Sequence, residues 1–290
     1  SVSTSENQTS VVTVSATDGD TSETLSYSLT GTDASSLSIN SSTGVITFNS
    51  APDYETKTSY SVTVNVSDGT NTTTQALTIN ITNVNDNDPT ISSSATFSAA
   101  ENQTSVGTVS ASDAEGDTLT YTLSGTDASS FSISSSSGVI TFNSAPDYET
   151  KTSYSITVNV SDGTHTTTQA LTINVSDVNE KPTDILLSND YVTENFYGAV
   201  FGTLSVTDPD SSDTLTLSLS GTDSSLFEIG TGNVLKFKDN VVGNYEAQYL
   251  FYPTITVTDS ASNTYSEVIT LSIKDVNESA TFTDYGGTNI

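Results

Sequence analysis

The sequence predicts an all-β protein made of three tandem Greek-key β-sandwich domains in an elongated array. Three observations lead to this prediction. Apolar residues alternate with Ser and Thr in short runs, as they do on strands that bury one face. Gly, Asp and Asn stand between the runs, where turns are expected. The chain also repeats itself with a period of about 94 residues, which is the size of one sandwich rather than of a solenoid unit.

The repeats are close copies at first and then diverge. Residues 31–80 and 125–174 align without a gap and differ at five of 50 positions. A third copy follows at nearly the same spacing, because Glu194 matches Glu101 just as Glu101 matches Glu6. We therefore expect repeat 1 at 1–88, repeat 2 at 89–181, repeat 3 at 182–278 and a tail at 279–290. Near-identical neighbours are typical of spacers and stalks.

The strands of repeat 1 follow from the alternation of apolar residues. Thr and Ser occupy the opposite faces, and β-branched Thr suits an exposed strand face. The alternating apolar positions, in chain order, are Val12, Val14 and Ala16; Leu25, Tyr27 and Leu29; Leu37 and Ile39; Ile46 and Phe48; Tyr60, Val62, Val64 and Val66; and Leu77, Ile79 and Ile81. No apolar stripe with helical spacing is found in the sequence.

Repeat 1 begins later within the repeat than its neighbour does. Residues 90–100 precede Glu101 in repeat 2, whereas only residues 1–5 precede Glu6. We expect most of a first strand to be missing, either because the chain is a piece cut from a longer array or because a partner chain supplies the strand. Residues 280–283 are similar to 95–98, so the tail either begins a fourth repeat or pairs with the open edge of a neighbouring copy.

The charge of the chain limits its partners. The sequence has 35 acidic and 6 basic residues, a formal net charge of −29. Such a charge argues against nucleic acid and anionic membrane surfaces as partners and favours cations. The chain has no Cys, which excludes disulfides, thiolate catalysis and sulfur-ligated metals. No apolar run approaches about 18 residues, so membrane insertion is not expected.

The acidic residues recur at equivalent places in the repeats. Each repeat has a Glu-Asn near its start, an acid pair after the second strand, an acid-Tyr-acid or Asn-Tyr-acid set in its middle, an Asp ending its clearest strand and an acid-rich end. In that order, these positions are Glu6, Glu101 and Glu194; Asp18, Asp20, Asp113, Glu115, Asp208 and Asp210; Asp53, Glu55, Asp147, Glu149, Asn244 and Glu246; Asp68, Asp162 and Asp259; and 83–89, 177–182 and 275–278.

This pattern predicts Ca²⁺ as the cofactor. Clustered carboxylates repel one another unless a cation lies among them. Ca²⁺ takes about six to eight oxygen ligands from carboxylates, amides and carbonyls. With one His and no Cys, the chain does not fit a soft-metal site. Asp, Asn and Gly also favour turns, and that preference could explain a single acidic set. It does not explain why five such sets recur at equivalent places in the repeats.

The order of these sets resembles the cadherin repeat, and the resemblance covers all three repeats. The short, Ser/Thr-rich repeats and the variant at 113–119 are most similar to cadherin-like domains of large bacterial or archaeal surface proteins. The resemblance implies calcium ions between consecutive repeats. It assigns to the first junction Glu6, Asp53, Glu55, Asn85, Asp86, Asn87, Asp113, Glu115 and Asp162. It assigns to the second junction Glu101, Asp147, Glu149, Asp177, Asn179, Glu180, Asp208, Asp210 and Asp259, with a carbonyl from Lys181.

Three departures from the family pattern leave the number of ions per junction at two or three. Asn83 stands where the family usually has Asp, Glu180 and Lys181 replace Asp and Asn, and Asn244 replaces the mid-repeat Asp. The resemblance also implies half-sites at the two ends of the array. They consist of Asp18, Asp20 and Asp68 at one end and of Glu246 and Asp275 at the other.

These observations lead us to expect an extracellular stalk or adhesin segment that calcium makes rigid. Such a segment would mediate attachment at the cell surface or act there as a spacer. Its expected partners are calcium and either further copies of itself, end to end, or a surface glycan or protein receptor. One alternative is a filament subunit assembled by strand exchange between chains. Another is a calcium-dependent glycan-binding module that uses the aromatic residues of repeat 3, with Tyr249 and Tyr252 as the first residues to test.

An enzyme is not expected. Asp53 and Glu55 could be interpreted as the acid pair of a glycosidase. However, the pair recurs in repeat 2 and is partly lost in repeat 3, which favours a structural role. His165 is the only His, and Asn71 stands at the equivalent position of repeat 1. A triad built on this His would exist in only one of two nearly identical domains.

Overall fold

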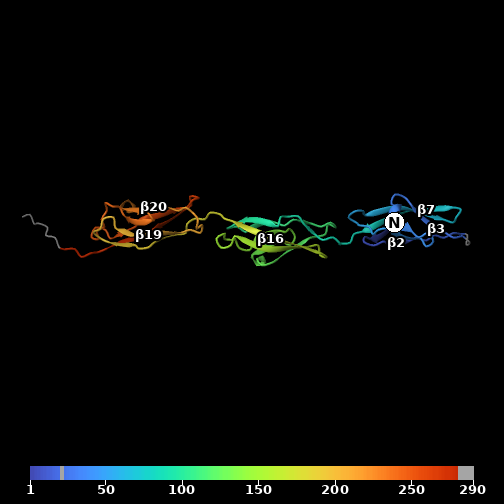
Figure 1. Cartoon of the computed structure of the whole chain (residues 1–290), viewed down its shortest axis with the longest axis horizontal. Helices are drawn as coiled ribbons and strands as arrows, with labels where there is room; N and C mark the ends of the chain where they lie inside the picture. Colours follow the sequence, from blue (N-terminus) through green and yellow to red (C-terminus); the bar gives the residue numbers. More distant parts are fainter. Residues whose placement is uncertain (20–22, 280–290) are drawn as a thin grey trace, which may run out of the picture. The chain divides into compact units, whose positions relative to one another are not determined.

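The computed structural model of the chain describes residues 1–19 and 23–279 (Figure 1). In this part of the chain, β-strands are joined by turns and three short 3₁₀ helices, so the all-β prediction is confirmed. The chain divides into two compact units. The first contains Ser1–Asp147 and Lys151–Ser176, and the second contains Tyr148–Thr150 and the described residues from Asp177 onward. Asp20 and the tail residues 280–290 lie outside the described residues, and the repeat boundaries remain predictions.

Repeat 1 is a sandwich of two sheets. Its strands are β1 (Val2–Ser5), β2 (Ser10–Thr13), β3 (Ser26–Thr30), β4 (Leu37–Ile39), β5 (Val45–Phe48), β6 (Ser59–Ser67) and β7 (Thr72–Thr82). One sheet has the order β1-β7-β6-β3 and the other the order β2-β5-β4. The chain therefore crosses between the sheets after β1, β2, β3 and β5. β1 runs parallel to β7, and the remaining pairs are antiparallel.

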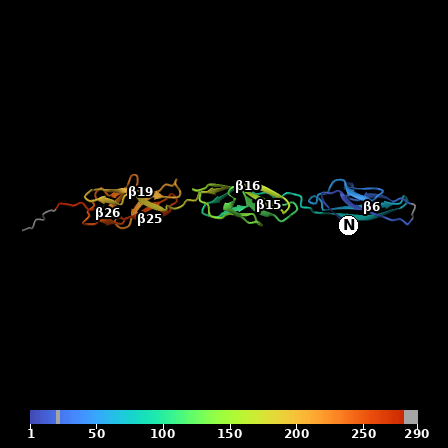
Figure 2. The same ribbon diagram turned by 90° about the horizontal axis from the view of Figure 1, so that it is seen from below.

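Repeat 2 has the same two sheets and one additional strand pair. Its strands are β8 (Thr90–Ile91), β9 (Thr96–Ala100), β10 (Ser105–Thr108), β11 (Ala111–Ser112), β12 (Thr120–Ser124), β13 (Phe131–Ile133), β14 (Val139–Phe142), β15 (Ser153–Ser161) and β16 (Thr166–Ser176). The sheets have the orders β12-β15-β16-β9 and β10-β14-β13, and β8 pairs with β11. Figure 2 shows β15 and β16 side by side, as their antiparallel register requires.

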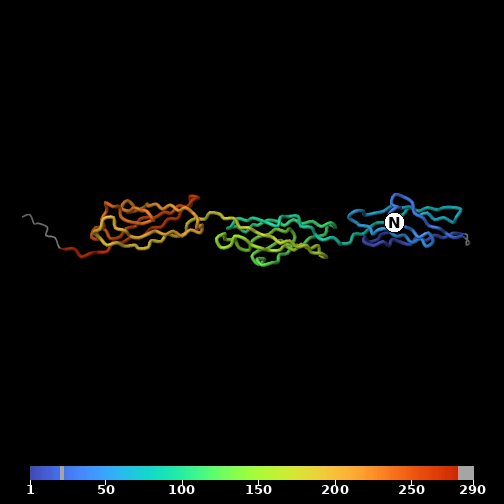
Figure 3. The backbone as a smooth tube through the Cα atoms, in the orientation of Figure 1, coloured from blue at the N-terminus to red at the C-terminus, as the bar shows by residue number. Residues whose placement is uncertain are grey.

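Repeat 3 begins with a strand of four residues, whereas repeat 2 begins with one of two residues. Its strands are β17 (Asp184–Leu187), β18 (Tyr191–Thr193), β19 (Val200–Thr207), β20 (Thr216–Ser220), β21 (Phe227–Gly230), β22 (Val234–Phe237), β23 (Leu250–Phe251), β24 (Thr254–Thr258), β25 (Thr264–Val268) and β26 (Leu271–Lys274). They form three sheets in the orders β17-β19-β22-β21, β18-β26-β23 and β20-β24-β25. The path of the backbone through each repeat can be followed in Figure 3.

The alternation of apolar residues builds the core of each sandwich. In β6, Val62 and Val64 are buried while the intervening residues are not, as the period of two predicts. Both sheets of repeat 1 contribute to one apolar cluster, which includes Ile46 and Ile79 without solvent exposure. In repeat 3, the rings of Phe227 and Phe237 stack with their centroids 4.9 Å apart. The sandwich places the turns, which carry most of the acidic residues, at its ends.

Candidate metal centres

A buried Glu follows the first parallel strand of each repeat and is bonded to the backbone. Glu6 is 3% exposed, and its carboxylate accepts N–H groups from Tyr54 at 2.7 Å and Val84 at 2.8 Å. Glu194 has no exposed surface and accepts the equivalent N–H groups of Tyr245 and Val276 at 2.9 and 2.8 Å. These hydrogen bonds lower the pKa of the Glu194 carboxyl. The two backbone hydrogen bonds therefore fix the place of the Glu6 and Glu194 side chains.

The Asn that follows each buried Glu turns the chain. Asn7, Asn102 and Asn195 have φ values of 61°, 60° and 68°, in the left-handed region that Asn tolerates better than most residues. Their N–H groups each donate to a carbonyl of the mid-repeat loop at 3.0 Å. The Glu-Asn pair thus brings the end of the first parallel strand against the loop that carries the acid-Tyr-acid or Asn-Tyr-acid set.

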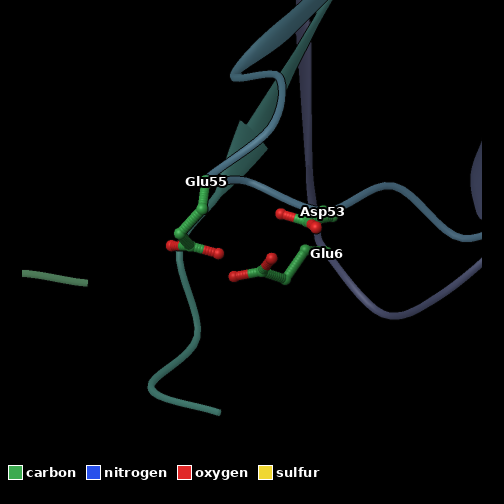
Figure 4. Close-up of side chains that lie close together, drawn as sticks. All are labelled: Glu6, Asp53 and Glu55. Atoms are coloured by element: carbon green, nitrogen blue, oxygen red, sulfur yellow. The ribbon is translucent and has the colours of Figure 1, made fainter. Parts of the chain in front are cut away.

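The mid-repeat acids meet the buried Glu in repeat 1. Glu6, Asp53 and Glu55 each place a carboxylate oxygen within 4.8 Å of the others, and Figure 4 shows the three side chains facing one another. Asp53 is held by the backbone N–H of Thr56, which donates to its Oδ1 at 3.0 Å. Glu101, Asp147 and Glu149 stand at the equivalent positions of repeat 2 in the sequence.

The first linker, residues 83–89 between β7 and β8, extends this group toward repeat 2. Oxygens of Glu55, Asp86 and Glu115 also lie within 4.8 Å of one another. Asn87 donates to Asp86 at 2.9 Å and also donates to Glu115. Asn85 donates to Oδ2 of Asp117 at 2.7 Å, so the linker amides are directed at carboxylates that precede β12. The structure therefore brings together predicted ligands from repeat 1, the linker and repeat 2.

Two buried carboxylate oxygens in the loop before β12 accept no hydrogen bond from any described residue. Oδ2 of Asp113 and Oε2 of Glu115 are buried, and no described residue donates a hydrogen bond to either. Asp162, at the end of β15, accepts the N–H groups of Thr164 and His165 through Oδ1, each at 2.6 Å. An unpaired buried acceptor costs about 1–3 kcal/mol, and more when it is charged. A cation bound by oxygen would remove that cost, so the donor set fits Ca²⁺.

The second unit holds a similar group of acids in repeat 3. The linker residue Asn179 donates to Oδ2 of Asp259 at 2.8 Å, and the N–H of Glu180 donates to Oδ2 of Asp210 at 2.6 Å. Asp208 has a buried Oδ2 to which no described residue donates. Asp177 follows β16 at the start of this linker. Five of the predicted ligands therefore lie together in the second unit, namely Asn179, Glu180, Asp208, Asp210 and Asp259.

Burial and like charges raise the pKa of two of these carboxyls. Partial loss of hydration raises the pKa of Asp208, and repulsion from Asp210 and Asp213 adds to the effect. Loss of hydration also raises the pKa of Glu55, together with repulsion from Glu6. Both shifts are those expected of carboxylates gathered without a counter-charge.

The sequence reasoning missed one acidic residue in each of these loops. Asp117 belongs to a group with Asp113 and Glu115, and Asp213 has a buried Oδ2 without a described donor. Glu23 forms a group with Asp18 and Asp68 in repeat 1. A signal for them exists in the sequence, because each is a third acid four or five residues after the first one in its loop.

The single His lies beside the first linker. Nδ1 of His165 is 3.0 Å from Oδ1 of Asn85 and 3.5 Å from Oδ2 of Asp162. Its neighbours are thus an amide and a carboxylate of the acidic cluster.

The described residues contain no helix with the length and apolar character that a membrane span requires.

Comparisons with known proteins agree with this geometry. The family model for the cadherin domain matches residues 1–82 and 95–176, which together are more than half of the chain. The search of curated proteins found no match.

Solved structures share the fold. The structure of PcdhgB3 EC1-4 has a TM-score of 0.70 at 23% identity, over 88% of this chain and 67% of that chain. Mouse cadherin-23 EC22-24 has a TM-score of 0.65 at 23% identity, over 95% of each chain. Protocadherin gammaB7 EC3-6, solved as a cis-dimer, has a TM-score of 0.67 at 22% identity, over 99% of this chain and 75% of that chain. With its sandwich fold, its recurring Glu-Asn turns and the match of its first two repeats, the chain belongs to the cadherin family.

Proposed function

We propose that this chain is a calcium-rigidified segment of an extracellular stalk or adhesin on the surface of a prokaryotic cell. The observation that supports this proposal best is the pair of buried oxygens on Asp113 and Glu115, which accept no hydrogen bond from any described residue. They lie in the loop that faces the acid-rich linker. Proteins rarely leave charged, buried acceptors unpaired, so this loop is suited to bind a cation.

The ligands of the proposed calcium ions are the two sets predicted from the sequence, with Asp117 and Asp213 added. Ca²⁺ supplies positive charge that offsets the repulsion among these carboxylates. Asp53, Glu55 and Glu6 belong to repeat 1, Asp113 and Glu115 to repeat 2. Shared coordination by both groups would couple the repeats and stiffen the linker. Extracellular calcium modules have dissociation constants of about 10⁻⁴–10⁻³ M, so calcium outside a cell would fill them.

The binding test is a calcium titration followed by calorimetry and by thermal unfolding. At about 10 mM calcium, each site should add about 1.4–2.7 kcal/mol to the free energy of unfolding. Glu115→Gln should weaken binding at least about tenfold, because ligand charge sets calcium affinity. Asp190→Asn is the matched control, since it removes one acidic charge from an exposed residue outside the clusters. Equal binding by both variants would contradict the ligand assignment.

The stiffening test is X-ray scattering of the chain in calcium and in chelator. We expect a broader distribution of interatomic distances in chelator, because repulsion then acts within the linkers. Identical scattering profiles in the two conditions would contradict a mechanical role for calcium, even if calcium binds.

Exposed aromatic residues on repeat 3 support glycan binding as a second candidate function. Tyr249 and Tyr252 are 52% and 44% exposed, whereas the neighbouring Phe251 is buried in the core. Aromatic rings in such positions can stack on sugars. A glycan array should then show binding that Tyr252→Ala removes while the melting temperature stays unchanged. An array without any binding would exclude this role for the tested glycans.

A further inference from the structure

The loop after β15 differs from its counterparts in the other two repeats at one position that carries different chemistry. His165 stands three residues after Asp162, at the place that Asn71 takes in repeat 1. In repeat 3, the N–H of Asn263 donates to Oδ1 of Asp259, just as the N–H of His165 donates to Oδ1 of its own Asp. The loop therefore keeps this backbone contact while repeat 2 has an imidazole in place of an amide.

This difference changes what reaches the second carboxylate oxygen of the Asp. In repeat 3, Nδ2 of Asn263 donates to Oδ2 of Asp259 at 2.8 Å, and in repeat 1, Nδ2 of Asn71 donates to Oδ2 of Asp68 at 3.4 Å. In repeat 2, the side chain of Asp162 has no exposed surface, and no described residue donates a hydrogen bond to its Oδ2. The imidazole thus leaves a buried carboxylate oxygen without the donor that the Asn supplies elsewhere.

Two oxygen atoms lie close to the ring of His165. Its Nδ1 is 3.5 Å from Oδ2 of Asp162, which is longer than an ordinary hydrogen bond, and 3.0 Å from Oδ1 of Asn85. The amide group of Asn85 donates to Oδ2 of Asp117 at 2.7 Å, so the carbonyl oxygen of Asn85 is the atom turned toward the imidazole. A ring nitrogen, a carboxylate oxygen and an amide oxygen therefore meet at the first linker.

The distance between Nδ1 of His165 and Oδ2 of Asp162 suits two ligands of one metal ion. Zn²⁺ binds His nitrogen and carboxylate oxygen at about 2.0–2.2 Å, so two such ligands at a tetrahedral angle lie about 3.3–3.5 Å apart. The amide oxygen of Asn85, 3.0 Å from Nδ1, needs only a small movement to become a third ligand. The His165 side chain is 32% exposed, so an ion can enter from solvent and keep a water as its fourth ligand.

We infer that His165, Asp162 and Asn85 form a zinc site beside the first linker, with Nδ1, Oδ2 and Oδ1 as the ligand atoms. Calcium does not account for the imidazole, because the ligands of Ca²⁺ are oxygens. One imidazole with carboxylate and amide oxygens is a donor set that suits Zn²⁺, whereas the lack of Cys excludes only thiolate sites. Coordination through Nδ1 requires the ring proton to be on Nε2.

The zinc site shares two residues with the proposed calcium ligands. Asp162 and Asn85 belong to both sets, so zinc and calcium would compete for the same oxygens, and each ion would weaken the other by the same factor. This competition rests on the proposed function, whereas zinc binding itself does not. Asn263 holds the equivalent place in repeat 3, so the second linker offers zinc no imidazole.

Nuclear magnetic resonance of the imidazole tests the site directly. The chain has one His, so the ring signals report on this place alone. Zinc is added to ¹⁵N-labelled chain in calcium-free buffer, and long-range ¹H–¹⁵N spectra follow the two ring nitrogens. We expect the Nδ1 signal of His165 to shift until the site is saturated, while Nε2 keeps its proton.

His165→Asn is the matched variant for calorimetry with zinc. It installs the residue that repeat 1 has at this place, and it keeps every carboxylate of the chain. Zinc bound only by the acidic clusters would therefore appear equally in both proteins. We expect the variant to bind zinc at least about tenfold more weakly than the unmodified chain, because the loss of a ligand costs no less than the loss of a group that orients one.

Three results would overturn the zinc site: equal zinc affinity of the two proteins, ring signals that zinc leaves unchanged, or a shift that shows coordination through Nε2. The titration of the unmodified chain is then repeated in about 10 mM calcium. Competition should weaken zinc binding about 10- to 100-fold, given calcium dissociation constants of about 10⁻⁴–10⁻³ M. A zinc affinity that calcium leaves unchanged would support the zinc site while contradicting the assignment of Asp162 and Asn85 to calcium.

Discussion

The carboxylate of Glu6 accepts the backbone N–H of Val84 at 2.8 Å, and this hydrogen bond ties the end of β1 to the linker after β7. Glu6 also accepts the N–H of Tyr54, so it joins three segments of repeat 1. Its two oxygens therefore serve the backbone while its carboxylate also faces Asp53 and Glu55. The buried side chain of Glu6 therefore has a structural role before any cation binds.

Glu6→Gln should destabilise repeat 1 in chelator. An amide has only one oxygen, so its NH₂ group would face one of the two backbone N–H donors. The expected loss of unfolding free energy is about 1–3 kcal/mol. Hydrogen exchange at the amides of Val84 and Tyr54 should become faster, while Asp190→Asn should leave it unchanged. Unchanged exchange in Glu6→Gln would contradict this role.

Gly44→Ala should destabilise the turn between β4 and β5. Gly44 has a φ of +68°, and a Cβ atom built on it would lie 2.3 Å from the carbonyl oxygen of Val14. The left-handed conformation alone costs about 1–2 kcal/mol for a residue with a Cβ, and the clash adds to it. Gly19→Ala is the control, because a Cβ there meets no atom within 4 Å. Equal melting temperatures for the two variants would refute the prediction.

Asp208→Asn should have opposite effects on stability without and with calcium. In chelator, the substitution removes repulsion from Asp210 and Asp213 and should stabilise the chain by on the order of 1 kcal/mol at neutral pH. In calcium, the same substitution removes a proposed ligand and should lower the melting temperature relative to the unmodified chain. Thermal unfolding in both conditions measures the change of sign. A loss of stability in both would indicate that Asp208 is needed for folding rather than for calcium.

The ion pair of Asp33 and Lys57 should make the free energy of unfolding depend on pH in the acidic range. The hydrogen bond from Lys57, aided by the N–H of Ser61, lowers the pKa of Asp33 below its ordinary value of 3.8. The contribution is therefore fully present above the unfolded pKa and is lost as the pH falls through the lower folded value. Asp33→Asn should cost less than about 1 kcal/mol at neutral pH, since Lys57 is partly exposed.

The difference between Asp33→Asn and the unmodified chain should shrink as the pH falls below 3.8. Thermal unfolding across this range measures it. Asp127→Asn should behave in the same way, because Lys151 lies 2.5 Å from Asp127 in repeat 2. A difference that stays constant with pH would exclude the ionised carboxyl as its source.

Much of the fold followed from local pattern. The strand β6 was predicted from Tyr60, Val62, Val64 and Val66, because a period of two is a property of neighbouring residues. The sequence also indicated that Glu6, Asp53 and Glu55 act together, since the same three positions recur at Glu101, Asp147 and Glu149. Their grouping in space agrees with that expectation, while their role as calcium ligands remains a proposal.

Other features could not be predicted from pattern alone. Asp113 and Asp117 stand in one loop, yet Asp117 accepts a hydrogen bond from Asn85 while Oδ2 of Asp113 is buried with no described donor. Which oxygen is left for a cation depends on atoms that are remote in sequence. The sequence by itself determined the three repeats, their alternating strands and the recurrence of the acids, because these are properties of residues close together in the chain. Only the tertiary structure decided which carboxylates are buried, because burial depends on which distant segments pack against each residue.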